Sequence, residues 1–144
     1  MSVKQISVFL ENRPGTLHDL TRTLADGGID LRAMSVAETK DFGIARMIVD
    51  DLDRAHTVLK EAQFVNSMTP VIAVAVDDVK GGLARVLDEF AKANVNVEYM
   101  YSALASKATG QAYMIMRVTD TQAAEKTLSA MNVKLVSQEE LAAM

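Results

Sequence analysis

The sequence contains no cysteine and only two histidines, His18 and His56. Without cysteine there is no disulfide bond, no thiolate metal site and no cysteine nucleophile. The two histidines do not have the spacing of metal ligands. We therefore expect neither a metal centre nor a cofactor, because no cofactor-binding loop is recognisable either.

Basic residues and long hydrophobic runs are also scarce. Lysine and arginine number 15 against 19 acidic residues, which gives a net charge of −4, and the pI is about 5.1. This balance disfavours nucleic acid as a partner. The longest uncharged stretch, residues 62–76, has 15 residues and is too short to span a bilayer. The N-terminus lacks the apolar core of a signal peptide, so we expect a soluble cytoplasmic protein.

Hydrophobic residues are plentiful, although few of them are aromatic. They make up 49% of the chain, with nine methionines, four phenylalanines, three tyrosines and no tryptophan. This composition is typical of a globular protein with an adaptable core. A chain of 144 residues suits one ordinary domain or two domains of about 70 residues each.

The chain repeats one pattern. When residues 11–36 are laid over residues 77–102, a shift of 66, the hydrophobic register agrees throughout. The identical positions are Gly15 with Gly81, Leu17 with Leu83, Ala25 with Ala91 and Met34 with Met100. A repeat of this length predicts two similar structural units.

Both copies share the order strand, helix, strand, strand, helix, strand. Strands are expected at residues 4–10, 30–38, 44–50 and 64–69, and again at 71–76, 96–103, 111–118 and 133–136, with a turn at 106–110. Apolar residues at helical spacing mark helices: Leu17, Leu20 and Leu24; Ala55, Val58, Leu59 and Ala62; Leu83, Val86, Leu87 and Phe90. Thr119 with Gln122, and Ser137 with Glu140, have the spacing of helix-capping pairs.

Each copy therefore has the order βαββαβ. Two split crossovers of this kind form a four-stranded antiparallel sheet with both helices on one face, the ferredoxin-like arrangement. We predict an α+β fold of two such units, residues 1–69 and 70–144. Only Thr69 and Pro70 separate the units, and Pro70 would interrupt a strand ladder. A link this short ties the units together side by side or face to face.

The most informative segment follows the first predicted strand and reads Glu11-Asn12-Arg13-Pro14-Gly15-Thr16-Leu17. Gly15 lacks a Cβ atom, so a ligand can approach the backbone closely. The N–H groups at the start of the next helix favour an anion such as an α-carboxylate, and the Asn12 amide can hold a carboxylate or an ammonium group. The alternative is purely structural, with Asn12 capping the helix and Pro14 occupying its first turn.

This loop and the doubled βαββαβ pattern resemble the ACT domain, a small amino-acid-sensing module. The segment from Leu10 to Leu17, followed by Gly28-Ile29-Asp30-Leu31, is similar to the serine-sensing regulatory domain of phosphoglycerate dehydrogenases. Its Glu-x-Arg-Pro core resembles the phenylalanine-sensing loop of prephenate dehydratases. The resemblance covers nearly the whole chain. It implies a ligand at the interface between two units, between this loop of one unit and the start of the second strand of the other.

Carried over to this sequence, the resemblance pairs Asn12 with Asn96, which matches the two-amide pattern of the serine-sensing family. The other crossed pair is Asp78 with Asp30, and two carboxylates would repel an α-carboxylate. We therefore predict one competent site per chain. Its residues are Leu10, Asn12, Arg13, Pro14, Gly15, Thr16, Leu17, Asn96, Val97 and Tyr99. A weaker second site would comprise Asp30, Leu31, Asp78, Gly81, Gly82 and Leu83.

The identity of the ligand and the type of function are less closely defined. Leu10 replaces a polar family position that helps to hold serine, which disfavours serine, while Met34, Tyr99 and Met100 would accept a larger side chain. The leading interpretation is an amino-acid sensor that acts as a homodimer or through an enzyme partner. The alternative is the regulatory small subunit of an enzyme of amino-acid metabolism. Because no paired base and nucleophile is evident, we do not expect an enzyme.

Overall fold

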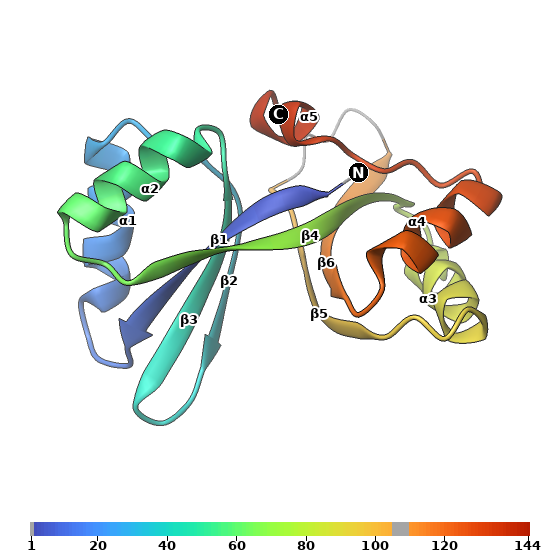
Figure 1. The fold of residues 1–144 in the computed structure, drawn as a ribbon, viewed down its shortest axis with the longest axis horizontal. Helices are drawn as coiled ribbons and strands as arrows, with labels where there is room; N and C mark the ends of the chain where they lie inside the picture. The colour runs from blue at the N-terminus through green and yellow to red at the C-terminus, as the bar shows by residue number, and fades with distance from the viewer. Residues whose placement is uncertain (1, 105–109) are drawn as a thin grey trace.

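The structure, a computed structural model, describes residues 2–104 and 110–144. The described residues form six strands and five helices (Figure 1). In chain order these are β1 (Val3–Glu11), α1 (Thr16–Asp26), β2 (Leu31–Glu38), β3 (Phe42–Val49), α2 (Leu52–Glu61), β4 (Asn66–Asp77), α3 (Gly82–Lys92), β5 (Val97–Ser102), β6 (Gln111–Val118), α4 (Thr121–Ala130) and α5 (Gln138–Ala142). The turn expected at 106–110 lies, apart from Gly110, outside the described residues.

The strands are ordered β2-β3-β1-β4-β6-β5, and every neighbouring pair is antiparallel. Strands β1 to β3 and the first half of β4 form the sheet of the first unit, which α1 and α2 cover on one face (Figure 1). The second half of β4, with β5 and β6, forms the sheet of the second unit, covered by α3 and α4. The predicted α+β class with two ferredoxin-like units is confirmed.

Strand β4 belongs to both units and runs without a break through Pro70, so the two strands predicted at 64–69 and 71–76 are one. Residues up to Val71 pair with β1, and residues from Ile72 pair with β6. Phe9 N–H donates to Val65 O at 2.9 Å, and hydrogen-bonded pairs alternate along an antiparallel ladder. Lys4 and Pro70 therefore form a non-hydrogen-bonded pair, in which the missing N–H of Pro70 removes no ladder bond.

The end of the second unit differs from the prediction. Instead of a strand at 133–136 there is one bridge between Val74 and Leu135. The expected capping box at Thr119 is also wrong, because the Asp120 side chain caps α4 by accepting from Ala123 N–H. The capping box of Ser137 and Glu140 at α5 is confirmed.

Three groups of buried side chains form the core. The first helix-side cluster, under α1 and α2, comprises Ile6, Val8, Leu10, Leu20, Leu24, Ile29, Ala45, Met47, Val49, Ala55 and Leu59. The second helix-side cluster, under α3 and α4, comprises Ile72, Val74, Val76, Val86, Phe90, Val95, Met116, Val118, Ala124 and Leu128. The inter-unit cluster comprises Val3, Ala33, Ile48, Val71, Ala73, Ala75, Tyr101, Ala103, Ile115, Val136 and Leu141.

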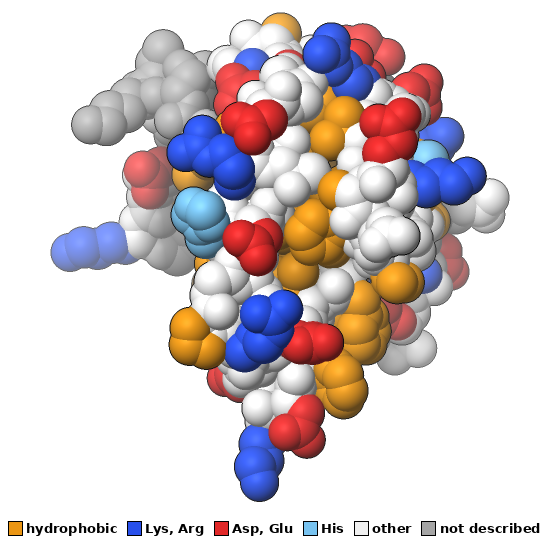
Figure 2. Space-filling model, turned by 90° about the vertical axis from the view of Figure 1, so that its left-hand side faces the viewer, with side chains coloured by type: hydrophobic (Ala, Val, Ile, Leu, Met, Phe, Trp, Pro, Cys, Tyr) orange, Lys and Arg blue, Asp and Glu red, His pale blue; other side chains and the backbone are white. Residues whose placement is uncertain are grey.

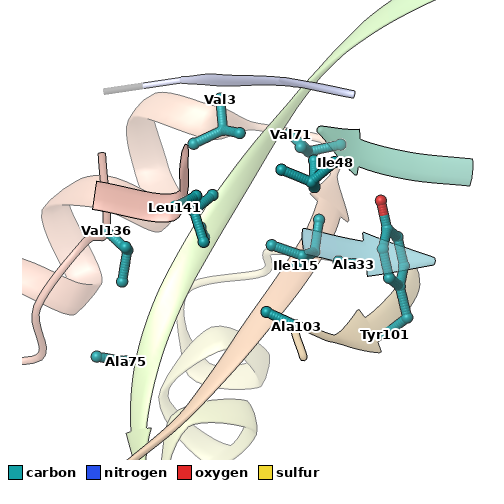
Figure 3. Close-up of a cluster of buried hydrophobic side chains, with 11 residues drawn as sticks. Val3, Ala33, Ile48, Val71, Ala75, Tyr101, Ala103, Ile115, Val136 and Leu141 are labelled. Atoms are coloured by element: carbon teal, nitrogen blue, oxygen red, sulfur yellow. The ribbon is translucent and has the colours of Figure 1, made fainter. Parts of the chain in front are cut away.

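The inter-unit cluster answers the question that the sequence left open. Its members come from the sheets of both units and meet on the sheet faces that the helices leave uncovered (Figure 3). The units therefore pack face to face, with a helix layer on each outer side and two sheets between them (Figure 1).

A buried polar group sits among these apolar side chains. Gln5 of β1 is fully buried, and its Oε1 accepts from the Tyr101 hydroxyl at 2.7 Å. Its Nε2 donates to Tyr99 Oη at 3.0 Å and to Ser7 Oγ at 2.9 Å. Burial, and secondarily the neighbouring Tyr99, raises the pKa of Tyr101 far above its usual value, so this hydroxyl remains a donor. The network links residues 96 positions apart and fixes the alignment of the two units.

We predict that Tyr101→Phe destabilises the chain by about 1–3 kcal/mol, because the buried Gln5 Oε1 is left without a donor. Chemical denaturation followed by circular dichroism measures the change. Tyr113→Phe is the matched control, since Tyr113 packs at the margin of the same cluster. Equal stability of the two variants would contradict a structural role for this hydrogen bond.

Candidate functional site between the units

The loop after β1 is attached to the β2–β3 hairpin. The Asn12 side chain donates through Nδ2 to Thr39 O at 3.0 Å and to Lys40 O at 3.4 Å, and Asn12 N–H donates to Asp41 O at 3.0 Å. Within the described part of the chain, Oδ1 of Asn12 accepts no hydrogen bond. Asn12 is therefore not a helix cap. Its Nδ2 holds the side chain on the β2–β3 hairpin, which leaves Oδ1 as an acceptor for a ligand.

The helices that follow the first strand of each unit begin without a side-chain cap. α1 starts after Gly15 (φ 91°) and α3 after Gly81 (φ 79°). The other three described helices are capped by Asp51, Asp120 and Ser137. Uncapped N–H groups at a helix start suit an anion. The two uncapped helices are those next to the loops that the sequence singled out.

The three glycines of these loops differ in their surroundings. A Cβ added at Gly15 or Gly81 would have no heavy atom within 4 Å, so the space above both residues is open. A Cβ at Gly82 would lie 2.2 Å from Asp77 O. Gly15 and Gly81 therefore leave room for a ligand against the backbone. At Gly82, by contrast, the backbone of Asp77 leaves no room for a side chain.

Other loop residues that the sequence proposed are used within the first unit. Leu10 is buried in the first helix-side cluster and points away from the loop surface. Arg13 pairs through Nε with Glu11 Oε2 at 2.7 Å. Thr16 Oγ1 donates back to Glu11 O at 2.9 Å, and Leu17 is exposed. Pro14 precedes α1 rather than occupying its first turn.

The partner residues from the second unit lie around the start of β5. Asn96 N–H donates to Thr119 Oγ1 at 3.3 Å, and Asn96 O accepts from Thr119 N–H at 3.0 Å. Val97 packs against the second helix-side cluster. Tyr99 faces the first unit, with the Arg46 guanidinium 3.8 Å above its ring.

The edges of β2 and β5 form a seam between the units. An antiparallel bridge joins Ala33 to Ala103, and Leu104 N–H donates to Arg32 O at 2.7 Å. β1 and β2 are parallel, since both are antiparallel to β3. Asn12 therefore lies at the end of β2, and the bridge directs the start of β5, with Asn96, toward that same end of the seam.

The strands of the seam diverge beyond the bridge. In Figure 1 the loop after β1 lies at the lower left and the start of β5 at the lower right. The loop that carries Asn12 and the start of β5 that follows Asn96 therefore lie at the same end of one seam but on its two separate sides.

Asp30 and Asp78, the crossed pair of the weaker second site, lie toward the end of the seam at which the bridge joins β2 to Ala103. Asp30 N–H donates to Asp50 Oδ1 at 2.8 Å, and the Asp30 carboxylate pairs with Arg32 at 3.2 Å. Asp78 N–H donates to Gly110 O at 3.0 Å. Each aspartate is thus bonded within its own unit, and Arg32 offsets the charge of Asp30. Leu31 and Leu83 pack against the two helix-side clusters.

A hollow of about 220 Å³, which was not predicted from the sequence, lies beside the loop after β4. Asp77, Arg85, Gln111 and Lys134 are among its lining residues. Arg85 pairs with Asp77 at 3.5 Å, Gln111 Nε2 donates to Asp77 Oδ1 at 3.3 Å, and Lys134 pairs with Glu140. These residues come from four separate segments, so no local motif marks them.

Two further features are absent from the described residues. No three or more histidine, cysteine, aspartate or glutamate side chains in the described ranges converge as metal ligands would. None of the helices in those ranges has the length and apolar character needed to cross a membrane.

Comparisons with known proteins agree with this architecture. A family model described as an ACT domain pair matches residues 1–144. The structure of protein BT0572 from Bacteroides thetaiotaomicron superposes with a TM-score of 0.92 at 36% identity, covering 100% of this chain and 98% of that one. A search of curated proteins found no match.

More distant structures share the fold alone. The regulatory subunit of aspartate kinase from Thermus thermophilus gives a TM-score of 0.61 at 17% identity, with 90% of each chain covered. Aspartate kinase from Synechocystis gives 0.57 at 20% identity, and the match covers 90% of this chain but 24% of that enzyme.

Proposed function

Since this chain belongs to the ACT domain pair family, we propose that it is a regulatory protein that binds an amino acid at the β2–β5 seam. The observation that supports this most directly is the antiparallel bridge between Ala33 and Ala103. It places the loop after β1 and the start of β5 at one end of the seam. The sequence resemblance implies a ligand between these two elements, which diverge beyond the bridge.

The groups at that end fit the two charges of an amino acid. The uncapped start of α1 suits the α-carboxylate, and open space above Gly15 allows it to approach. Asn12 Oδ1 is an acceptor for the ammonium group, and Asn96 supplies a second amide from the other side of the seam. Tyr99 lies on β5 near the side chain of such a ligand, whereas Met34 and Met100 pack against the helix-side clusters.

Binding would then be coupled to the geometry of the seam. A ligand that touches both units favours the arrangement in which β2 and β5 approach each other beyond Ala33. It shifts the equilibrium only by its difference in affinity for the open and closed arrangements. We propose this closure as the signal that the protein passes on, without catalysis.

One site per chain is expected. Asp30 and Asp78 carry carboxylates where the other crossed pair carries amides, so the bridged end of the seam is less suited to an α-carboxylate. A thermal-shift screen of the common amino acids tests the function, because a ligand of the folded state raises the melting temperature. Titration calorimetry on a hit then gives the stoichiometry, and two ligands per chain would contradict the single site.

We predict that Asn12→Ala weakens binding of the hit by about 1–3 kcal/mol, since its polar partner on the ligand is left unsatisfied. Asn96→Ala should have an effect of the same size. Gln122→Ala, an exposed amide on α4, is the matched control. Affinities come from calorimetry and folding from circular dichroism. Unchanged affinity in a folded Asn12→Ala variant would remove Asn12 from the site.

A second candidate function is that of a regulatory subunit for an enzyme of amino-acid metabolism. Its support is the fold shared with the aspartate kinase regulatory subunit of Thermus thermophilus. A flat thermal-shift screen together with stoichiometric capture of one enzyme would favour this second candidate.

A further inference from the structure

Four hydrophobic side chains on the first unit have no part in its core or in the proposed site. Phe9 is 53% exposed, Phe42 51% and Val65 73%, and Ile44 is partly exposed. Phe9 lies opposite Ile44 in the ladder of β1 and β3, and its N–H bonds to Val65 O on the other side. The ring centroids of Phe9 and Phe42 are 5.9 Å apart. We call Phe9, Phe42, Ile44 and Val65 the apolar patch.

The apolar patch lies on the sheet face turned away from α1 and α2. Val8, Leu10 and Ala45 point into the first helix-side cluster, and side chains alternate along a strand, so Phe9 and Ile44 point to the opposite face. Further along that face of β1 lie Gln5 and Val3, which are buried against the second unit. The patch therefore continues the surface on which this chain already packs one sheet against another.

The patch is uncharged. A hollow of about 180 Å³ beside Phe9, Ile44 and Val65 is bordered by Ser7, Asn66 and Ser67. The charged residues next to it on the same face already have partners, because Glu11 pairs with Arg13 and Arg46 lies over the Tyr99 ring. The outer surface of α1 and α2 is different, since charged side chains of both signs are spread over it around the hydrophobic side chains in its middle (Figure 2).

The second unit shows what covers the equivalent surface there. Ala75 stands 66 positions after Phe9 and is buried in one cluster with Val136 and Leu141. The C-terminal segment thus covers this face of the second unit. Within residues 2–104 and 110–144 no such segment covers the first unit, because β4 runs straight on into the second unit. A small covered residue in one unit therefore corresponds to a large exposed one in the other.

We infer that the apolar patch binds the same patch of a second copy of this chain. A two-fold interface must be complementary to itself, and an uncharged aromatic surface meets that condition in a chain whose net charge is −4. Aromatic rings also associate favourably in tilted pairs. A stable dimer buries about 800 Å² on each partner, more than four side chains supply, so the dimer dissociates on dilution. This inference does not rest on the proposed amino-acid site.

Sedimentation velocity over a hundredfold range of protein concentration tests the interface. We expect the unaltered chain to shift from monomer to dimer, and Phe9→Thr and Val65→Thr each to move the midpoint at least tenfold upward. Val79→Thr removes a side chain that is 60% exposed on the second unit and should leave the midpoint unchanged. Val65→Thr keeps the test valid if Phe9→Thr does not fold. A chain that stays monomeric, or a dimer indifferent to both patch variants, overturns the inference.

Discussion

Replacing Ile115 with alanine is expected to destabilise the whole chain by about 2–5 kcal/mol. Ile115 on β6 is fully buried in the inter-unit cluster, where residues of both sheets surround it (Figure 3). The substitution leaves a cavity between the units, which the two sheets cannot close because β4 joins them covalently. Urea denaturation followed by circular dichroism measures the loss.

The form of the transition matters as much as its midpoint. Because β4 and the inter-unit cluster belong to both units, we expect one cooperative transition in the unaltered chain and in the variant. Leu59→Ala, in the first helix-side cluster, should lower the same single transition. Two transitions, of which Ile115→Ala moves only one, would show that the units unfold independently.

The sequence predicted the fold class and most of the elements, but not how the units pack. Periodicity identifies the apolar face of an element and not its partner. One signal was present, because residues 71–76 are apolar without alternation, as expected for a strand covered on both faces. The structure buries all six of them. Pro70 misled the prediction because its effect depends on register, and register is set by partners far away in the sequence.

The candidate site was likewise predictable in its local features but not in its contacts between the units. The loop from Asn12 to Gly15 was found from local chemistry, since its amide and glycine stand next to a helix start. The burial of Leu10 was also predictable, because it alternates in step with Ile6 and Val8. Contacts across the interface were not. The bond from Gln5 to Tyr99 joins residues 94 positions apart, and no local pattern encodes it.

Gly81 and Gly82 are adjacent and look alike in the sequence, yet we expect alanine at these positions to have very different effects. At Gly82 the new Cβ would lie 2.2 Å from the backbone oxygen of Asp77, where no side chain can rotate away. Either β4 or the start of α3 must shift, at a cost of about 3 kcal/mol or more. At Gly81 the space is open, and the cost is about 1–2 kcal/mol for a left-handed backbone, φ 79°.

Urea denaturation of Gly81→Ala and Gly82→Ala compares the two costs directly, and each variant serves as the other's control. If Gly82→Ala is the less harmful, the close approach of Asp77 O to Gly82 is not maintained in solution. If the second unit holds a ligand, the two variants also differ in ligand binding. Only the methyl group added at Gly81 would project into the open space that a ligand would occupy. Amino-acid binding that survives both substitutions would restrict the site to the first loop, where Asn12 and Gly15 lie, and a loss confined to Gly81→Ala would place a ligand on the second.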